Sequence, residues 1–470
     1  MTSPESKSQN SGHSLAHDSV GTTLTNVALF IVGILIWIAI ARILGPIWRG
    51  ALALVMIAPT IVIKGGTFGF DQGMIVLGGG DRNKLGPLTR TGIVFGLIFG
   101  LIAVGILMGF MWGFPKTFWR ICQEVWMPLP FLLISLAFPL HLMTLVYDAA
   151  IYAEDRISAR NLKELVINVL MLLILAALVF FWHKRLIGVI LAYVLANIIS
   201  LLYAMLLVRG HVNLSGRPDM KLASQAVKLG FPVYLAQLAA YIMLPAMMVV
   251  LSFSLTGKAG DNLARIAYFT MAYQMIERTL PVTRSVAFAL LPKITDGSDA
   301  EAGRLAARAS RHTLIAAAGI FILLVLFMHP IVSILLGQQY ISIVGAFAIM
   351  APGGIALSLI GVWSAHLLAR HRPMPVAWGG ILGVITALVI SWLGFNYLPE
   401  GREVMAASIA VVSGTLVNAL YLLPTFCKIG KIPLREALVP GIDDFRDWKR
   451  IPGLVKRVIM RKRHRTEDGA

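Results

Sequence analysis

The chain has 470 residues, of which 57% are hydrophobic and 14% charged, and its mean hydropathy is +0.78. A soluble domain is closer to half apolar and a quarter charged. This composition excludes a soluble enzyme, a disordered protein, a collagen and a small disulfide scaffold. It leaves a membrane protein with many spans.

Basic residues outnumber acidic ones, with 41 Lys and Arg against 23 Asp and Glu, for a formal net charge of +18. A membrane protein acquires such an excess from basic cytoplasmic loops and from a basic tail at anionic headgroups. We therefore expect no nucleic-acid partner. The two cysteines, Cys122 and Cys427, are predicted to lie on opposite membrane faces, too far apart for a disulfide.

Apolar windows of about 20 residues, the length of a membrane-spanning helix, recur about twelve times. They lie near 23–42, 50–70, 91–112, 127–148, 164–182, 187–208, 232–254, 265–290, 312–335, 344–368, 374–395 and 404–426. The polar start of the chain lacks the basic character of a signal peptide, so the first window is read as a retained span. We predict an all-α polytopic membrane protein of about 12 transmembrane helices in two pseudo-symmetric six-helix bundles.

The distribution of Lys and Arg predicts the orientation. With the N-terminus inside, the inside segments carry about 29 basic residues and the outside loops about 8, which favours two cytoplasmic termini. The predicted organisation is a cytoplasmic N-terminal tail at 1–22, an N-terminal bundle at 23–208, a cytoplasmic linker at 209–231, a C-terminal bundle at 232–426 and a basic cytoplasmic tail at 427–470. We expect a multi-pass membrane protein.

A weak internal repeat supports two halves. Gly45 follows the first window and Gly260 the seventh, while Arg156 and Arg372 follow the fourth and tenth. Each pair is separated by about 215 residues. Six spans restore the sidedness of the chain, so the two halves are expected in parallel orientation, a known transporter plan.

The C-terminal tail has an amphipathic segment. Its apolar residues fall on one helical face and its basic residues on the rest: Leu454, Val455, Val458 and Ile459 against Lys456, Arg457, Arg461 and Lys462. The pattern is typical of an interfacial helix on anionic lipid. A disordered, solvated basic tail is the alternative.

The eighth window has an unusually polar face. At 100° per residue one arc collects Thr270, Tyr273, Gln274, Glu277, Arg278, Pro281, Arg284 and Ser285. Charges at bilayer depth are costly unless paired or wetted. We interpret the face as the lining of a water-filled, net-positive cavity. An internal salt bridge that only locks two helices is the alternative.

The second window has a narrower stripe, with Thr60, Lys64, Thr67 and Asp71 on one face if the helix is continuous. The separation of Lys64 and Arg278 matches the repeat, so the two cations are expected to face each other. The alternative is a lysine that extends to the cytoplasmic headgroups. The surrounding glycines resemble a nucleotide loop, but no GxxxxGK[ST] is present, so we reject a nucleotide site.

The seventh window places Tyr234, Gln237 and Tyr241 on one face, groups that suit sugar hydroxyls and ring faces; ordinary helix packing is the alternative. Asp148 and Asn197 are isolated polar residues, read as contacts between helices. No motif for a catalytic nucleophile or a metal is present. We therefore expect no enzyme, no metal and no cofactor.

Four segments carry a resemblance to a known family. They are ARILGPIWRGALALVM (41–56), VKLGFPVYLAQLAAYIM (227–243), ERTLPVTRSVAFALLPKI (277–294) and LLGQQYISIVGAFAIMAPG (335–353). In this order they resemble Wzx-type polysaccharide flippases of the multidrug/oligosaccharidyl-lipid/polysaccharide (MOP) exporter superfamily. Ile47 and Trp48 depart from the acidic or polar residues usual in the first segment.

The resemblance implies a V-shaped pair of six-helix bundles with alternating access. It implies a lipid-linked oligosaccharide as substrate, usually on polyprenyl pyrophosphate, and coupling to a proton or sodium gradient. The cavity arginines of the family correspond here to Arg278 and Arg284, joined by Lys64. Tyr273, Gln274, Gln237 and Tyr241 are the further substrate-binding candidates, and Glu277 and Asp71 the candidates for ion coupling.

Two alternatives remain. A drug or metabolite exporter of the same superfamily predicts a more anionic cavity, because typical drugs are cations. A membrane glycan ligase or polymerase requires large outside loops with acid and base residues, and the predicted outside loops are short. Lys64, Arg278 and Arg284 against Glu277 and Asp71 leave a net positive charge. That balance favours an anionic lipid.

Overall fold

The structure, a computed structural model, describes residues 4–122, 128–181, 185–295, 299–399 and 401–441, without the side chains of 4–24, 119, 179–181, 185, 284–295 and 299–300. Within these ranges the regular secondary structure is helical. The helices are α1 Pro4–Val55, α2 Ile57–Gly65, α3 Phe70–Gly80, α4 Arg82–Gly113, α5 Pro115–Ile121, α6 Pro128–Ser135, α7 Ala137–Ala153, α8 Ile157–Phe181, α9 Arg185–Val208, α10 Met220–Tyr241, α11 Met243–Ser254, α12 Ala259–Thr295, α13 Asp299–Leu335, the short 3-10 turn η1 Gln338–Tyr340, α14 Ile343–Ala369, α15 Pro373–Tyr397, α16 Glu403–Gly430 and α17 Leu434–Leu438.

Within the described residues the apolar windows fall on helices, with short breaks such as the one at 66–69. This confirms an all-α, multi-pass membrane protein. Ten stretches of the described chain are long and apolar enough to cross a membrane. The first of them, Thr25–Gly80, contains two windows, and α12 is absent from the ten. The polar face of α12 accounts for that absence, because charged residues within a span lower its mean hydropathy.

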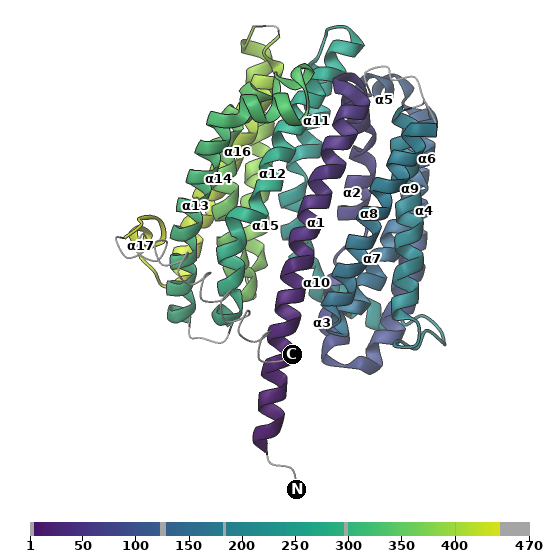
Figure 1. Ribbon diagram of the computed structural model, residues 1–470, viewed down its shortest axis with the longest axis vertical. Helices are drawn as coiled ribbons and strands as arrows, with labels where there is room; N and C mark the ends of the chain where they lie inside the picture. Colours follow the sequence, from purple (N-terminus) through teal and green to yellow (C-terminus); the bar gives the residue numbers. More distant parts are fainter. Residues whose placement is uncertain (1–3, 123–127, 182–184, 296–298, 400, 442–470) are drawn as a thin grey trace, which may run out of the picture.

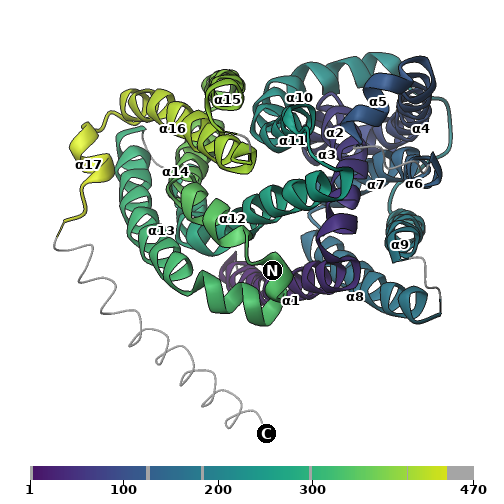
Figure 2. The same ribbon diagram turned by 90° about the horizontal axis from the view of Figure 1, so that it is seen from above.

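The helices run side by side, and α12–α16 gather on one side of the molecule while α4–α9 gather on the other (Figures 1 and 2). Helix α1 packs against both α8 and α12, and α10 packs against both α3 and α15. These two helices therefore connect the two groups. The largest apolar core cluster includes residues of both, such as Trp37, Phe138, Phe269 and Phe347.

Helix α1 is bent where the first span ends. Gly45 has φ 69° and ψ 172°, outside the helical region, and Pro46 follows it. Pro46 has no N–H to continue the helical hydrogen bonds at this point. The hydroxyl of Tyr340, which is fully buried, donates to the Ala41 carbonyl, in the turn before the bend, at 2.8 Å. The bend is therefore fastened to the short turn between α13 and α14.

The second span is broken, which corrects the expectation of one continuous helix over 50–70. Helix α2 ends at Gly65 and α3 begins at Phe70, and Phe68 (φ 48°) and Gly69 (φ 81°) between them are left-handed. The prediction that Lys64 and Asp71 share one helix face assumed a continuous helix. It does not hold, because the two residues belong to different helices.

The glycines around this break allow α3 and α10 to touch. A Cβ at Gly73 would lie 1.8 Å from the carbonyl oxygen of Ala226, and a Cβ at Gly230 would lie 1.9 Å from that of Gly69. Such close backbone approach is characteristic of small residues at helix interfaces in membranes. The glycine-rich segment thus serves helix packing.

The ends of the predicted segments differ from the helix bounds. Helix α10 begins at Met220, inside the predicted linker, where the side chain of Asp219 accepts from the Leu222 N–H at 3.0 Å. Helix α16 continues to Gly430 and α17 follows it. The amphipathic tail segment falls at 442–470, outside the described residues.

Candidate substrate-binding site

Four polar side chains of α1 and α12 meet in a group that we call the arginine cluster: Trp37, Arg49, Gln274 and Arg278. The side-chain oxygen of Gln274 accepts from Trp37 Nε1 and from Arg49 Nη2, both at 2.8 Å. The guanidinium of Arg278 lies over the Trp37 ring, 5.6 Å from its centroid. The cluster therefore joins two helices that belong to different halves of the predicted repeat.

Both arginines of the cluster have hydrogen-bonding capacity to spare. Arg49 is 7% exposed and Arg278 is half-buried. The Nε atom of each is buried and has no hydrogen-bond partner within the described residues. A buried N–H donor without an acceptor costs free energy, and a guanidinium stays charged. An anion with several oxygens, or ordered water, would satisfy both groups.

The other candidates of α12 occupy different surroundings. Glu277 is half-buried and interacts electrostatically with Arg278. Tyr273 is 4% exposed and packs in the main apolar core cluster. Arg284 belongs to the α12 backbone, but its side chain lies outside the described part of the chain.

A second group, the lysine cluster, consists of Lys64, Tyr234 and Tyr241. Lys64 Nζ lies over the Tyr241 ring, 4.0 Å from its centroid, a cation–π contact between α2 and α10. The Tyr234 hydroxyl donates to the Gly65 carbonyl at 2.9 Å. That carbonyl is the last of α2, where the break removes its helical donor. The second and seventh spans thus meet at these residues.

The remaining two candidates lie near the lysine cluster along the chain. Gln237 is exposed on α10. Asp71 is half-buried in the first turn of α3, where Gln72 Nε2 donates to its carboxylate at 2.9 Å. The structure places Lys64 against Tyr241 and Gln274 near Arg278. A common vestibule between Lys64 and Arg278 stays a prediction.

Sequence reasoning missed Trp37 and Arg49. It assigned Arg49 to an outside loop, whereas α1 continues past its bend to Val55 and Arg49 is buried.

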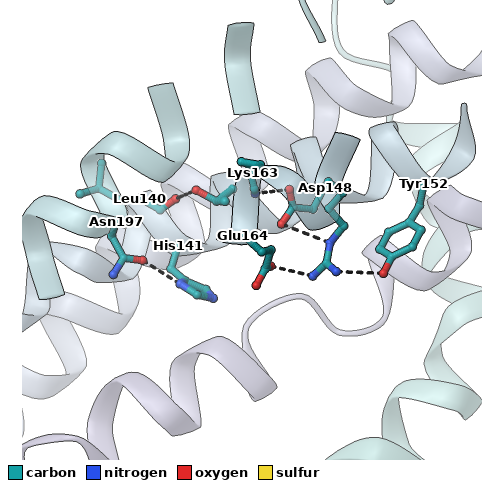
Figure 3. Close-up of polar contacts among 9 residues, drawn as sticks. Leu140, His141, Asp148, Tyr152, Lys163, Glu164 and Asn197 are labelled. Atoms are coloured by element: carbon teal, nitrogen blue, oxygen red, sulfur yellow. Dashed lines mark hydrogen bonds and ion pairs between the residues drawn. The ribbon is translucent and has the colours of Figure 1, made fainter. Parts of the chain in front are cut away.

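A network of charged side chains on α7 and α8, extended by Asn197 of α9, was also missed (Figure 3). Lys163, 1% exposed, forms an ion pair with Asp148, and Arg160 Nε lies 3.7 Å from the same carboxylate. Arg160 also contacts Glu164 at 2.9 Å and the Tyr152 hydroxyl at 2.9 Å. Asp148 is therefore not an isolated polar residue.

The network continues toward the lysine cluster. His141 Nδ1 and the Asn197 side-chain oxygen are 2.8 Å apart (Figure 3), and His141 interacts electrostatically with Asp148, Lys163 and Lys64. His141 and Asp148 are seven residues apart on α7 and so share a face. That spacing, with three charges at the start of α8, was the signal in the sequence.

About nine tenths of the chain resembles solved structures, although no protein-family model matches its sequence and no curated protein matches it. The lipid II flippase MurJ in an inward closed conformation superposes with a TM-score of 0.69 at 13% identity, over 90% of this chain and 89% of that one. An inward-facing multidrug resistance MATE family transporter of the MOP superfamily gives 0.66 at 14%, over 87% and 96%. This chain has the MOP fold.

A third MOP structure is instructive for its binding pocket. A transporter from Pyrococcus furiosus, described by a reverse polarity of binding pocket that suggests a different function, gives a TM-score of 0.53 at 14% identity over 88% of this chain and 93% of that one. These neighbours are transporters and flippases, not enzymes. At such low identity the likeness concerns the fold, so a substrate of this chain must be argued from its own residues.

Proposed function

We propose that the protein is a flippase that moves a lipid-linked oligosaccharide, carried on polyprenyl pyrophosphate, across a bacterial cytoplasmic membrane by alternating access. The observation that carries the proposal is the arginine cluster, in which two guanidinium groups each have a buried Nε–H without an acceptor among the described residues. A pyrophosphate supplies several oxygens and negative charge for such donors. A structural neighbour with the same fold is a lipid II flippase.

The physical difficulty of the reaction fits these features. A sugar pyrophosphate cannot cross about 30 Å of hydrocarbon unaided, while its polyprenyl tail can remain in the bilayer. Arg49 and Arg278 would hold the phosphates at the junction of α1 and α12, with Arg284 and Lys64 adding positive charge. Gln274, Gln237, Tyr241 and Tyr273 complete the proposed substrate-binding set. We further propose that the two halves are pseudo-symmetric six-helix bundles and that both termini are cytoplasmic.

Ion coupling is proposed at the two carboxylates, Glu277 and Asp71. Glu277 lies beside Arg278, so a change in its protonation or in bound Na⁺ would alter the charge that the phosphates meet. The test is transport by Glu277→Gln in vesicles with and without an ion gradient. If flipping by the variant depends on the gradient as it does in the parent, Glu277 has no such role.

The substrate is tested in cells that lack the gene. We expect lipid-linked sugar to accumulate on the inner leaflet, and the parent gene but not Arg278→Glu to restore export. Arg265→Gln is the matched control, because Arg265 lies on the same helix but pairs with Glu403 at 2.8 Å. Full export by Arg278→Glu, with normal membrane insertion, would remove the arginine cluster from the mechanism.

The second candidate is a drug or metabolite exporter, since MATE transporters share the fold. The two arginines of the arginine cluster against Glu277 make it less suited to a cationic drug. Drug sensitivity of the knockout with normal surface polysaccharide would favour the exporter. Adjacent glycosyltransferase genes would favour the flippase, and the membrane ligase or polymerase remains the least favoured candidate.

A further inference from the structure

A polar cavity of about 430 Å³ lies at the end of the molecule where α4 begins. Three separate segments form it: the start of α4 at 82–90, the turn after α7 at Glu154, and residues 211–215 between α9 and α10. Basic-residue counting assigns all three segments to the cytoplasmic side. The cavity is therefore expected at the inner membrane surface, remote from the arginine cluster.

The charges of this cavity are predominantly positive. Arg82 and Arg90 line it, with His211 beside them, and Glu154 is the one carboxylate among the lining residues. That carboxylate is already engaged by Arg156 Nη1 at 3.4 Å. A ligand in the cavity therefore meets an excess of cationic groups.

Arg90 is the central group. It is half-buried, and its Nε is buried with no hydrogen-bond partner in the described chain. By contrast Lys84, on the same helix, pairs with Asp81 at 3.5 Å and does not line the cavity. A guanidinium held at a cavity without an acceptor for its Nε–H suits an oxyanion.

The segment that joins the two halves is fitted closely over this arginine. Gly216 has φ +111°, and a Cβ there would lie 2.9 Å from Arg90 Nη1. A Cβ at Gly86 would lie 2.4 Å from the Asn213 carbonyl oxygen. The Asp219 N–H donates to the Thr91 hydroxyl at 2.9 Å. One wall of the cavity is thus the connection between the first six spans and the rest.

We propose that this cavity binds a phosphate-class anion, either the headgroup of an anionic lipid or a soluble phosphate compound, and that the bound anion holds residues 209–219 against α4. The anion bridges Arg90 and Arg82 on α4 to the His211 and Asn213 side of the segment. This site is independent of the transported substrate.

The test uses the full-length protein purified in neutral detergent. Binding of inorganic pyrophosphate is measured by calorimetry, and binding of phosphatidylglycerol against phosphatidylcholine by native mass spectrometry. We expect Arg90→Gln to weaken binding by about tenfold or more, the typical cost of losing a hydrogen bond to a charged group. Arg82→Gln, at an exposed position, should weaken it less, and Lys84→Gln should leave it unchanged.

A second readout reports on the connecting segment. Arg209 is exposed, and we expect the bound anion to slow tryptic cleavage after it in the parent but not in Arg90→Gln. Phosphatidylglycerol binding that depends on Arg90 identifies the lipid source, and pyrophosphate binding alone identifies the soluble source. The proposal is overturned if neither probe binds, or if folded Arg90→Gln, with an unchanged melting temperature, binds both as the parent does.

Discussion

The ion pair between Asp148 and Lys163 provides the sharpest test of how this bundle is stabilised. Both side chains are under a tenth exposed, and removing one partner of such a pair costs about 3–5 kcal/mol, because the other charge is left buried without compensation. Asp148→Asn leaves the Lys163 ammonium buried without a negative charge to pair with. We therefore expect this variant to lose about 3–5 kcal/mol of unfolding free energy.

Replacing Lys163 instead of Asp148 should cost less unfolding free energy, because a second cation lies near the Asp148 carboxylate. In Lys163→Met the Asp148 carboxylate keeps Arg160, whose Nε is 3.7 Å away. The double variant Asp148→Leu with Lys163→Met should be within about 1–2 kcal/mol of the parent, since replacing a whole buried pair by apolar groups is often neutral. Arg160 retains Glu164 and Tyr152 as partners in that variant.

The measurement is unfolding free energy in mixed micelles, with the melting temperature as a second probe. Glu164→Gln is the control, because its pair with Arg160 is partly solvent-exposed and should contribute under about 1 kcal/mol. An Asp148→Asn variant as stable as the parent, or less affected than Lys163→Met, would refute the reasoning.

Three further predictions follow from single contacts. Gly73→Ala should separate α3 from α10 and lower the melting temperature, because its Cβ would lie 1.8 Å from the Ala226 oxygen. Gly80→Ala is the control, because its Cβ would meet nothing within 4 Å and should leave the melting temperature unchanged. Equal melting temperatures of the two variants would contradict this. Tyr340→Phe should lose about 0.5–1.5 kcal/mol of unfolding free energy, the net contribution of one hydrogen bond, because the variant cannot donate to the Ala41 carbonyl. Burial raises the pKa of the Cys122 thiol from 9.0 to about 12, so below pH 9 its thiolate fraction falls about a thousandfold. Maleimide should label Cys122 at least that much more slowly in the folded protein than after unfolding, and similar rates would count against its burial.

The sequence predicts the helices well because membrane spans are long and uniformly apolar. It identifies the polar face of α12 from residue spacing, because α12 is a continuous helix there. The contact of Lys64 with Tyr241 was not predicted, because it joins two spans that are distant in the chain. It fails at residues 66–69, where two left-handed residues break the second span, because a 3.6-residue period assumes a continuous helix. It also fails for Arg49, whose partner Gln274 comes from a helix distant in the chain, because pairing of this kind has no periodicity to detect. Asp148 does lie at a contact between helices, as expected, but its charged partners on α8 were not identified.

The break between α2 and α3 sets a condition on any movement of α10. The Gly65 carbonyl depends on the Tyr234 hydroxyl of α10 as its donor. If the two helices part during a transport cycle, that oxygen would be stranded in hydrocarbon at a cost of several kcal/mol. A water molecule or a sugar hydroxyl has to take over as the donor at that moment. Water therefore has to reach the break in the second span whenever the two helices separate. A cargo rich in hydroxyl groups could itself donate the hydrogen bond that Tyr234 then no longer supplies.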